Sequence, residues 1–354
     1  MISSQASNTA DPRRNLEALA WLETLPTVAS LSAPTLASHW FGRTAIARGY
    51  GLSSHPRLAR GGRKLYAQTF AHPALSPYKT ILLPHGRLLV PRNDTSIVPS
   101  LLFLRSYETA FRRILLRILR PGDTALDVGA HVGFHTVGMA KRVGPVGQVH
   151  AFEPEPDLLK VLEANVVMNG IRSWTSTSGK AISDCTGEGK LWHDGSNTGG
   201  ASLISACIAS VDGVGAHDPV TVTMDTLDDY AASNVAGDMD LVKIDVQGNE
   251  ERVIRGGWSS ILASKSTLAF EFNPIQFAEA GVEAADLLEL LLSESYEILV
   301  ASEIPSKAKH FTRRHFDEWK KRRTLQDWDG LLNVAAVHRE RLQEFPWCQE
   351  LGHS

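Results

Sequence analysis

Residues 124–136 constrain the fold of this chain more than any other stretch of its sequence. The apolar run from Thr124 to Val128 reads as a buried strand, and it passes through Gly129 and Gly133 into a segment with helical spacing. Glycine lets the backbone approach a ligand closely, and a helix that begins at such a turn presents unpaired N–H groups and the positive end of its dipole. The stretch therefore predicts a strand, a turn and a helix that hold a nucleotide-like cofactor.

The acid before this turn narrows the choice of ligand. Asp127 precedes Gly129, and the turn carries only part of the G-x-G-x-x-G pattern that marks dinucleotide-binding sites. A carboxylate repels phosphates and attracts cations, so a ligand with an ammonium group suits this position better than a pyrophosphate. S-adenosylmethionine has that property, and we expect it to be the cofactor.

A second acid follows at the end of the next apolar run. Glu153 comes directly after residues 147–152, roughly 20 residues beyond the turn, where a strand-end carboxylate can accept hydrogen bonds from a ribose diol. The alternative is a solvated strand end, or a charge at the start of the helix that residues 157–169 predict. Together with Asp127 and Gly129, Glu153 favours a nucleoside site.

Composition excludes several other classes of protein. The chain has 354 residues, 43% of them apolar, which is enough for one large α/β domain with an added segment. A net charge of −3 provides no field that would attract nucleic acid, and three cysteines without a C-x-x-C pair argue against a disulfide framework or a zinc site. The sequence shows neither a secretory leader nor an apolar run of membrane-spanning length. We therefore expect a cytoplasmic protein with no membrane span and no nucleic-acid partner.

The chain divides into three parts. We expect residues 1–78 to form an N-terminal extension without an assigned role, residues 79–340 to form the α/β domain, and residues 341–354 to form a C-terminal tail. The extension has apolar helical spacing at residues 16–22. It also has a basic run at residues 57–64, which is either a solvated loop or a contact for a phosphate or an acidic substrate.

Strands and helices alternate through the α/β part. It opens with a hairpin at residues 80–90 and an amphipathic helix that ends at Pro121 and Gly122. Further strands are expected at residues 180–183, 220–224, 240–246, 267–273, 296–301 and 332–337, and helices near residues 250–261 and 284–291. This alternation predicts a largely parallel sheet covered by helices on both faces.

Polar residues gather where two of these strands end. Asp245 lies near the end of the strand at residues 240–246, and Glu271 and Asn273 close the strand that follows. Ligands of such sheets bind beyond the carboxyl ends of the strands, so these oxygens should converge on the cofactor crevice. They would suit Mg²⁺ with a substrate hydroxyl, or a metal-free base and substrate clamp. The alternative is that one of them caps a helix or pairs with Lys243.

A series of motifs follows in a fixed order along the same part of the chain. They are residues 127–134, 152–154, 181–184, 200–203, 226–229 and 242–250, with Asn165 and Asn169 between the second and the third. In this order they resemble the FkbM family of S-adenosylmethionine-dependent methyltransferases, over roughly residues 80–300. The resemblance implies a class I methyltransferase fold, Rossmann-like, with six parallel strands and a seventh antiparallel strand. It also implies methyl transfer, typically to a hydroxyl of a sugar or secondary metabolite, with S-adenosylhomocysteine as product.

Each candidate site residue can be given a role on this basis. We expect Asp127 to hold the amino-acid end of the cofactor and Glu153 its ribose. Further cofactor contacts are expected at Gly129, His131 and Gly133 of the turn, at Glu108 before the first strand, and at Ala181 and Ser183, where the resemblance places the adenine. A base should help a weakly nucleophilic hydroxyl to react, and Asp245 is the first candidate, with Glu271 and His193 behind it.

Two departures from the family pattern keep rival interpretations open. The family usually has a glutamate where this chain has Gln247, which would suit a binding protein that kept the fold and lost the chemistry. It often has Asn and Tyr where His131 and His135 stand, so these histidines either tune the pocket or only fix the local backbone. An NAD(P)-dependent reductase is the other rival, because it also uses glycines and a ribose-binding acid.

The acceptor is expected to be a small molecule or a glycan. Trp174 and Trp192 would either stack on a sugar face or pack in the core.

Overall fold

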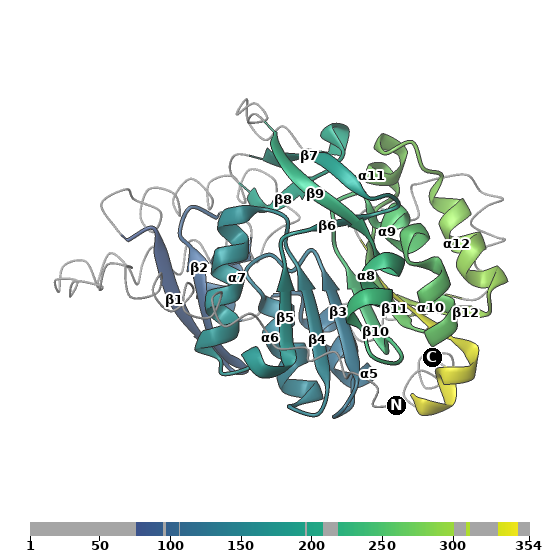
Figure 1. Ribbon diagram of the computed structural model, residues 1–354, viewed down its shortest axis with the longest axis horizontal. Helices are drawn as coiled ribbons and strands as arrows, with labels where there is room; N and C mark the ends of the chain where they lie inside the picture. Colours follow the sequence, from purple (N-terminus) through teal and green to yellow (C-terminus); the bar gives the residue numbers. More distant parts are fainter. Residues whose placement is uncertain are drawn as a thin grey trace, which may run out of the picture.

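The computed structural model describes residues 76–94, 97–105, 107–194, 197–207, 219–300, 309–311 and 332–345. Its centre is an eight-stranded sheet in the order β13-β12-β14-β11-β10-β3-β4-β5 (Figure 1). In chain order these strands are β3 (Thr124–Val128), β4 (Gln148–Phe152), β5 (Thr175–Ser178), β10 (Leu241–Ile244), β11 (Thr267–Phe272), β12 (Tyr296–Val300), β13 (Lys309–Phe311) and β14 (Leu332–His338). The N-terminal extension, with the features expected at residues 16–22 and 57–64, lies almost entirely outside the described residues.

The directions of the strands confirm the expected fold class. β5, β4, β3, β10 and β11 pair in parallel, and β14 pairs antiparallel with both β11 and β12. Six strands therefore share one direction and β14 opposes them, as in a class I methyltransferase, while β13 adds a short antiparallel edge. The chain leaves β3 toward β4 and later returns to β10 on the other side of β3. Ligands bind at such a point of reversal, beyond the carboxyl ends of the strands.

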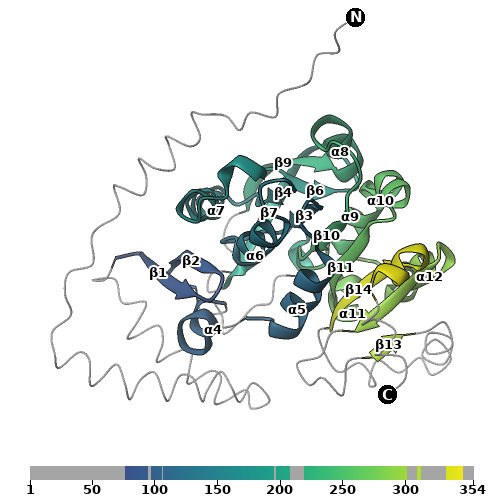
Figure 2. The same cartoon turned by 90° about the horizontal axis from the view of Figure 1, so that it is seen from below.

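Helices cover both faces of the sheet, as the alternating pattern predicted (Figure 2). The helices are α4 (Ile97–Leu104), α5 (Thr109–Ile118), α6 (Phe134–Val143), α7 (Pro156–Met168), α8 (Leu227–Asn234), α9 (Glu250–Gly256), α10 (Trp258–Ser264), α11 (Pro274–Glu279) and α12 (Ala284–Ser293). Side chains of α5, α6 and α7 share one apolar cluster with Ala125 of β3, and those of α8 to α12 share the other with Leu126. All five residues of β3 are buried, as expected of a central parallel strand.

Two of the expected strands belong to a different sheet. β6 (Ala181–Ser183) and β9 (Val220–Thr226) pair with each other, and β7 (Gly187–Asp194) and β8 (Asn197–Ser202) complete a four-stranded sheet in the order β6-β9-β7-β8. Only two residues separate β5 from β6, and a parallel neighbour in the main sheet would need a crossover connection of a dozen or more. The sequence analysis also missed β5, because its residues Thr-Ser-Thr-Ser have no apolar pattern.

The hairpin expected at residues 80–90 is confirmed and is fastened to the core by a buried asparagine. It consists of β1 (Tyr78–Leu83) and β2 (Gly86–Pro91). Asn165 of α7 accepts the Leu89 N–H at 2.6 Å and donates to the carbonyl oxygens of Leu89 and Val132, at 2.8 and 2.7 Å. A single side chain on α7 therefore joins the hairpin to the loop that follows β3.

The C-terminal end of the described chain packs back onto the sheet. The described residues also include the short 3₁₀ helices η1 (Arg172–Trp174), η2 (Ser205–Cys207) and η5 (Arg339–Glu344). The boundary expected at residue 340 falls within η5, and Arg341 of this helix lies 3.2 Å from the Asp240 carboxylate. Within the described residues, no helix has the length and apolar character needed to cross a bilayer.

Candidate active site

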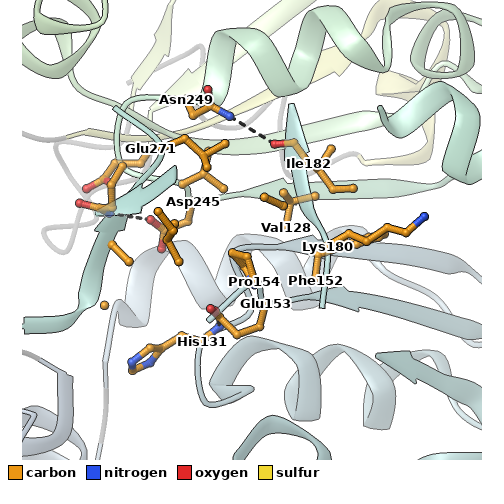
Figure 3. A pocket seen from close by; sticks show the side chains of 18 of the residues that line it. Val128, His131, Phe152, Glu153, Pro154, Lys180, Ile182, Asp245, Asn249 and Glu271 are labelled. Carbon is orange, nitrogen blue, oxygen red and sulfur yellow. Dashed lines mark hydrogen bonds between the residues drawn. The ribbon is translucent and has the colours of Figure 1, made fainter. Parts of the chain in front are cut away.

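A cavity of about 260 Å³ lies where the strand order of the main sheet reverses (Figure 3). One wall comes from the ends of β3, β4, β10 and β11 and carries most of its polar groups, among them His131, Glu153, Asp245, Gln247 and Glu271. The opposite wall comes largely from the small sheet and is apolar: Ile182, Leu191, Ala201 and Leu203. The cavity therefore joins an acidic side to a hydrocarbon side.

The glycine turn after β3 leaves no room for a side chain. Gly129 has φ +78°, and a Cβ there would lie 1.8 Å from the carbonyl oxygen of Asp245. The N–H groups of Gly129 and Ala130 both donate to the carbonyl oxygen of Phe152, at 3.1 and 2.8 Å. Gly133, with φ +83°, precedes α6, and a Cβ there would meet Leu162 at 2.7 Å. Gly129 lines the cavity, whereas Gly133 shapes the turn behind it.

Glu153 lies on the floor of the cavity, held by main-chain groups. Its carboxylate accepts the N–H of His131 at 2.8 Å and the N–H of Glu155 at 3.0 Å. Burial raises the pKa of Glu153 to about 7. His131 has a left-handed backbone, with φ 51°, and its ring also lines the cavity, where burial lowers its pKa. The turn thus orients an acid that is half-ionised near neutral pH.

Asp245 and Glu271 also reach the cavity and are bridged by one amide. The Gln247 side-chain nitrogen donates to Asp245 Oδ1 and to Glu271 Oε2, at 2.9 Å each. Burial, together with the charges of Asp245 and Glu250, raises the pKa of Glu271 to about 10, so Glu271 is protonated at neutral pH. The structure therefore brings together the first two residues expected to act in catalysis.

The sequence of this chain is similar to sequences of known methyltransferases. Residues 127–298 match the methyltransferase FkbM domain family. The match runs from β3 into β12 and so includes the strands whose ends form the cavity. The 31-O-demethyl-FK506 methyltransferase FkbM of Streptomyces tacrolimicus is 28% identical to this chain, over 39% of it, and the chain spans 60% of the length of that relative.

Two solved structures show a distant likeness to this chain. A methyltransferase FkbM from Methylobacillus flagellatus KT has a TM-score of 0.35 at 16% identity, covering 54% of this chain and 43% of that one. An O-methyltransferase from Bacillus cereus, solved in complex with SAH, has a TM-score of 0.36 at 10% identity, covering 65% of this chain and 79% of that one. The fold is identified by the strand order and strand directions of this chain, which are those of a class I methyltransferase.

Asp127 of the FkbM domain lies behind the turn, not on the cavity surface. Its side chain is 0% exposed, accepts a hydrogen bond from Thr136 Oγ1 at 2.6 Å and lies 3.1 Å from Lys243 Nζ. Lys243, 2% exposed, also donates to the Gly129 carbonyl oxygen at 2.8 Å. Burial alone would favour its neutral amine, but the Asp127 and Asp245 carboxylates raise the pKa of Lys243 above its ordinary value. Where the sequence analysis expected a cofactor contact, the structure shows a buried ion pair that supports the turn, so that contact stays a prediction.

Glu108 is likewise engaged next to the cavity. It precedes α5 with a left-handed backbone, and its carboxylate lies 3.0 Å from His135 Nε2. Burial works against ionisation, yet the hydrogen bond and charge of His135 lower the pKa of Glu108. Neither residue is among the described residues that line the cavity, whereas the neighbouring Tyr107 is. The role of Glu108 as a cofactor contact therefore stays a prediction.

Of the two residues expected near an adenine, Ala181 lines the cavity and Ser183 does not. Ala181 lines the cavity together with Lys180 and Ile182, and the Asn249 side chain donates to the Ile182 carbonyl oxygen at 3.2 Å (Figure 3). Ser183 is buried behind them, with its hydroxyl 3.4 Å from the same amide. Asn249 thus joins the small sheet to the loop after β10.

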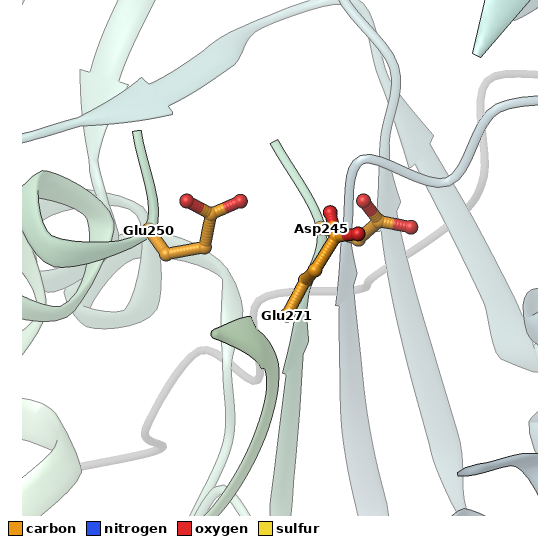
Figure 4. A group of neighbouring side chains, drawn as sticks. All are labelled: Asp245, Glu250 and Glu271. Atoms are coloured by element: carbon orange, nitrogen blue, oxygen red, sulfur yellow. The ribbon is translucent and has the colours of Figure 1, made fainter. Parts of the chain in front are cut away.

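The acidic cluster at the strand ends is not arranged as an open metal site. Carboxylate oxygens of Asp245, Glu250 and Glu271 lie within 4.8 Å of one another, and Figure 4 shows Glu250 to one side on α9. Glu250 accepts the N–H groups of Val246 and Gly248, at 3.0 and 2.9 Å, and Glu271 is protonated and bonded to Gln247. Asn273, the third expected oxygen ligand, instead caps α11 by accepting the Ile275 and Gln276 N–H groups. The donors fit a hydrogen-bonded clamp better than Mg²⁺.

The remaining candidates lie away from the cavity. His193 is on β7 and is not among the described residues that line it; its Nε2 atom is buried with no hydrogen-bond partner in the described part of the chain. Trp174 donates to the Ala140 carbonyl oxygen at 2.8 Å and packs against the core. Of the two roles expected for Trp174, stacking on a sugar or packing in the core, the structure shows the second.

Three residues of this site were not predicted from the sequence: Tyr107, Lys243 as the partner of Asp127, and Asn249. A lysine inside an apolar strand was the one available signal, because buried lysines are rare unless paired.

Proposed function

We propose that this FkbM domain transfers a methyl group from S-adenosylmethionine to a hydroxyl group of a small-molecule or glycan acceptor. The observation that supports it most directly is the charge of the cavity. Glu153 and Asp245 line it beside the protonated Glu271, and Lys180 is the sole Lys or Arg among the described lining residues. Lys180 is itself paired with Asp225 at 2.6 Å. Such a cavity attracts a sulfonium and an ammonium group and repels a pyrophosphate, which disfavours the nicotinamide-dependent reductase.

The residues present fit the cofactor. Gly129 lets the loops after β3 and β10 meet at the cavity wall, and the carboxylate of Glu153 faces the cavity beside it, where a ribose diol could donate to it. When bound, the cofactor supplies a methyl group already activated by its positive sulfur. The protein then has to orient the acceptor oxygen and remove its proton as the new C–O bond forms and the C–S bond breaks. Asp245, 25% exposed and at the cavity wall, accepts that proton and passes it to solvent.

The experiment that tests the function combines binding with transfer. Calorimetric titration of the purified protein with S-adenosylhomocysteine should show one binding site, and titration with NADH should show none. Transfer of a labelled methyl group to a panel of hydroxylated metabolites and oligosaccharides then identifies the acceptor. Tight NADH binding without thioether binding would overturn the proposal, and cofactor binding without transfer to any acceptor would favour the inactive binding protein.

Glu153 should make cofactor affinity depend on pH. In the empty protein its pKa is about 7, and a ribose diol needs the carboxylate form, so S-adenosylhomocysteine should bind more weakly as the pH falls from 8 to 6 and should release a proton on binding. Glu153→Gln should lower affinity at pH 8 roughly tenfold or more, because it removes charged hydrogen bonds, and should flatten the pH dependence. Calorimetry in buffers of different ionisation enthalpy measures both effects. Glu188→Gln, on an exposed face of β7, is the matched control. A wild-type affinity that stays flat across this range would contradict the assignment.

Asp245 should affect turnover more than cofactor binding. Asp245→Ala removes the proposed base and is expected to lower kcat by about 10²–10⁴-fold, while changing affinity for S-adenosylhomocysteine far less. Steady-state kinetics and calorimetry on the same preparation separate the two. Asp157→Ala, at a side chain 74% exposed, controls for the loss of a carboxylate. Unchanged turnover in the Asp245 variant would remove this residue from the mechanism.

A further inference from the structure

Gln247 has an unusual backbone conformation for a residue with a side chain. It follows β10 with φ 53°, in the left-handed region, and its side chain lines the cavity. A residue with a Cβ adopts this conformation only at a cost in free energy. Residues of this kind persist where surrounding contacts determine their position, often at functional sites.

Three contacts fix the side-chain amide of Gln247, and a fourth holds its main chain. Its nitrogen donates to Asp245 in the same turn and to Glu271 at the end of β11, at 2.9 Å each. Its side-chain oxygen accepts from Gln276 of α11 at 3.3 Å. Its main-chain oxygen accepts from Ser202 Oγ, at the end of β8, at 2.8 Å. The opposite orientation of the amide would place its oxygen against the two carboxyl groups, so the bridge has one favourable orientation.

We propose that Gln247 is a positioning residue, and that its amide holds Asp245 as the proton acceptor and Glu271 as a neutral hydrogen-bond donor to the acceptor oxygen. This inference rests on the proposed methyl transfer and assigns a role to the position at which the chain departs from its family. A neutral amide has two N–H groups and can bridge both carboxyl groups without adding charge. A glutamate would add a third acid to the cluster.

The surroundings of the two carboxyl groups favour this division of roles. Asp245 is 25% exposed and lies 3.8 Å from Lys243 Nζ, so both water and a cation stabilise its charge. Glu271 is 7% exposed, and burial and neighbouring acids raise its pKa to about 10. The charged and titratable groups that surround the pair are Glu108 before α5, Tyr107 beside it, His131 after β3, Lys243 on β10 and Glu250 on α9. Within the described part of the chain, the ammonium group near this pair is that of Lys243, and it lies on the Asp245 side.

The Gln247→Glu variant tests the proposal, since it keeps the shape of the side chain and changes its charge. We expect the pH of half-maximal kcat to rise by about one unit or more, because the added acid disfavours a charged base. The KM for S-adenosylmethionine should change little. Gln247→Ala should lower kcat about tenfold with a smaller shift of the profile, as expected for the loss of one hydrogen bond to a charged group. Gln148→Glu, at the start of β4, adds the same charge away from the cavity and should leave the profile unchanged. Identical pH profiles for wild type and Gln247→Glu would overturn the proposal.

A measurement without catalysis separates this proposal from the proposed function. NMR of protein labelled with ¹³C at the Glu side-chain carboxyl carbons reports on Glu271, whose signal is the one that is absent from Glu271→Gln. In the wild-type protein this signal should keep the chemical shift of a protonated carboxyl group at pH 7. Gln247→Glu should add a carboxyl signal that titrates above its ordinary range. An ionised Glu271 at pH 7 would overturn the bridge even if methyl transfer is observed. Failure to bind S-adenosylhomocysteine would overturn the function and leave the carboxyl titrations interpretable.

Discussion

Replacing Gly129 with alanine is expected to abolish cofactor binding and to destabilise the domain. The new Cβ would lie 1.8 Å from the Asp245 carbonyl oxygen, a main-chain atom that cannot move without displacing the loop after β10. The left-handed backbone at φ +78° adds about 1–2 kcal/mol for any residue with a Cβ, and the displacement adds roughly 1–3 kcal/mol. Calorimetry with S-adenosylhomocysteine and urea unfolding measure the two effects.

A second glycine supplies a control that isolates the collision. Gly281 has φ +75°, close to that of Gly129, but a Cβ there would meet nothing within 4 Å. Gly281→Ala should therefore show the backbone cost alone and keep its cofactor affinity. If both variants lose the same stability and both still bind, the close approach of the two loops is not what the site requires.

Replacing Lys243 with methionine is expected to lower the free energy of unfolding by about 3–5 kcal/mol, as the loss of one partner of a buried ion pair does. The Asp127 carboxylate would remain 0% exposed without its cation, and the Gly129 carbonyl oxygen would lose its donor. Because this oxygen belongs to the cofactor turn, affinity for S-adenosylhomocysteine should fall as well. Urea unfolding followed by circular dichroism measures the change in stability.

Two further variants test the cause of that loss. Asp127→Asn in the Lys243→Met background removes the uncompensated charge and should restore part of the lost stability. Lys160→Met breaks a pair of similar length, 2.7 Å to Asp157, between side chains that are 56% and 74% exposed. Exposed pairs contribute about 0–1 kcal/mol, so this change should be close to neutral. Equal losses in the Lys243 and Lys160 variants would show that burial of the pair is unimportant.

Much of the fold could be predicted because local patterns dictate it. Few structures are compatible with the run of buried residues in β3, the glycines after it and the acid after β4. These features place the expected cofactor crevice at the reversal of strand order. The failures have physical causes too. β5 is an edge strand made of Thr and Ser, which gains its order by pairing with β4. β6 and β9 resemble main-sheet strands in composition, and only the short connection after β5 separates them from that sheet.

The site was predicted less completely because burial and partners depend on distant parts of the chain. Asp127, Glu153 and Asp245 all lie at strand ends beside the crevice, as expected, but only the last two line the cavity. Asp127 points inward because Lys243 of β10 lies opposite it in the register of the sheet. No spacing along the sequence reveals that pairing. The same holds for Gln247, whose four contacts come from segments up to 45 residues away.

The wall of the cavity formed by β7 and β8 has a consequence for how the cavity can vary. This hairpin pairs within the small sheet and forms no ladder with β3, β4, β10 or β11. Its inward side chains can therefore be exchanged for larger, smaller or more polar ones without disturbing the strands that carry the cofactor turn. Under the proposed function, acceptor preference can therefore change through variation in this hairpin alone, while the strands that carry the glycine turn stay the same.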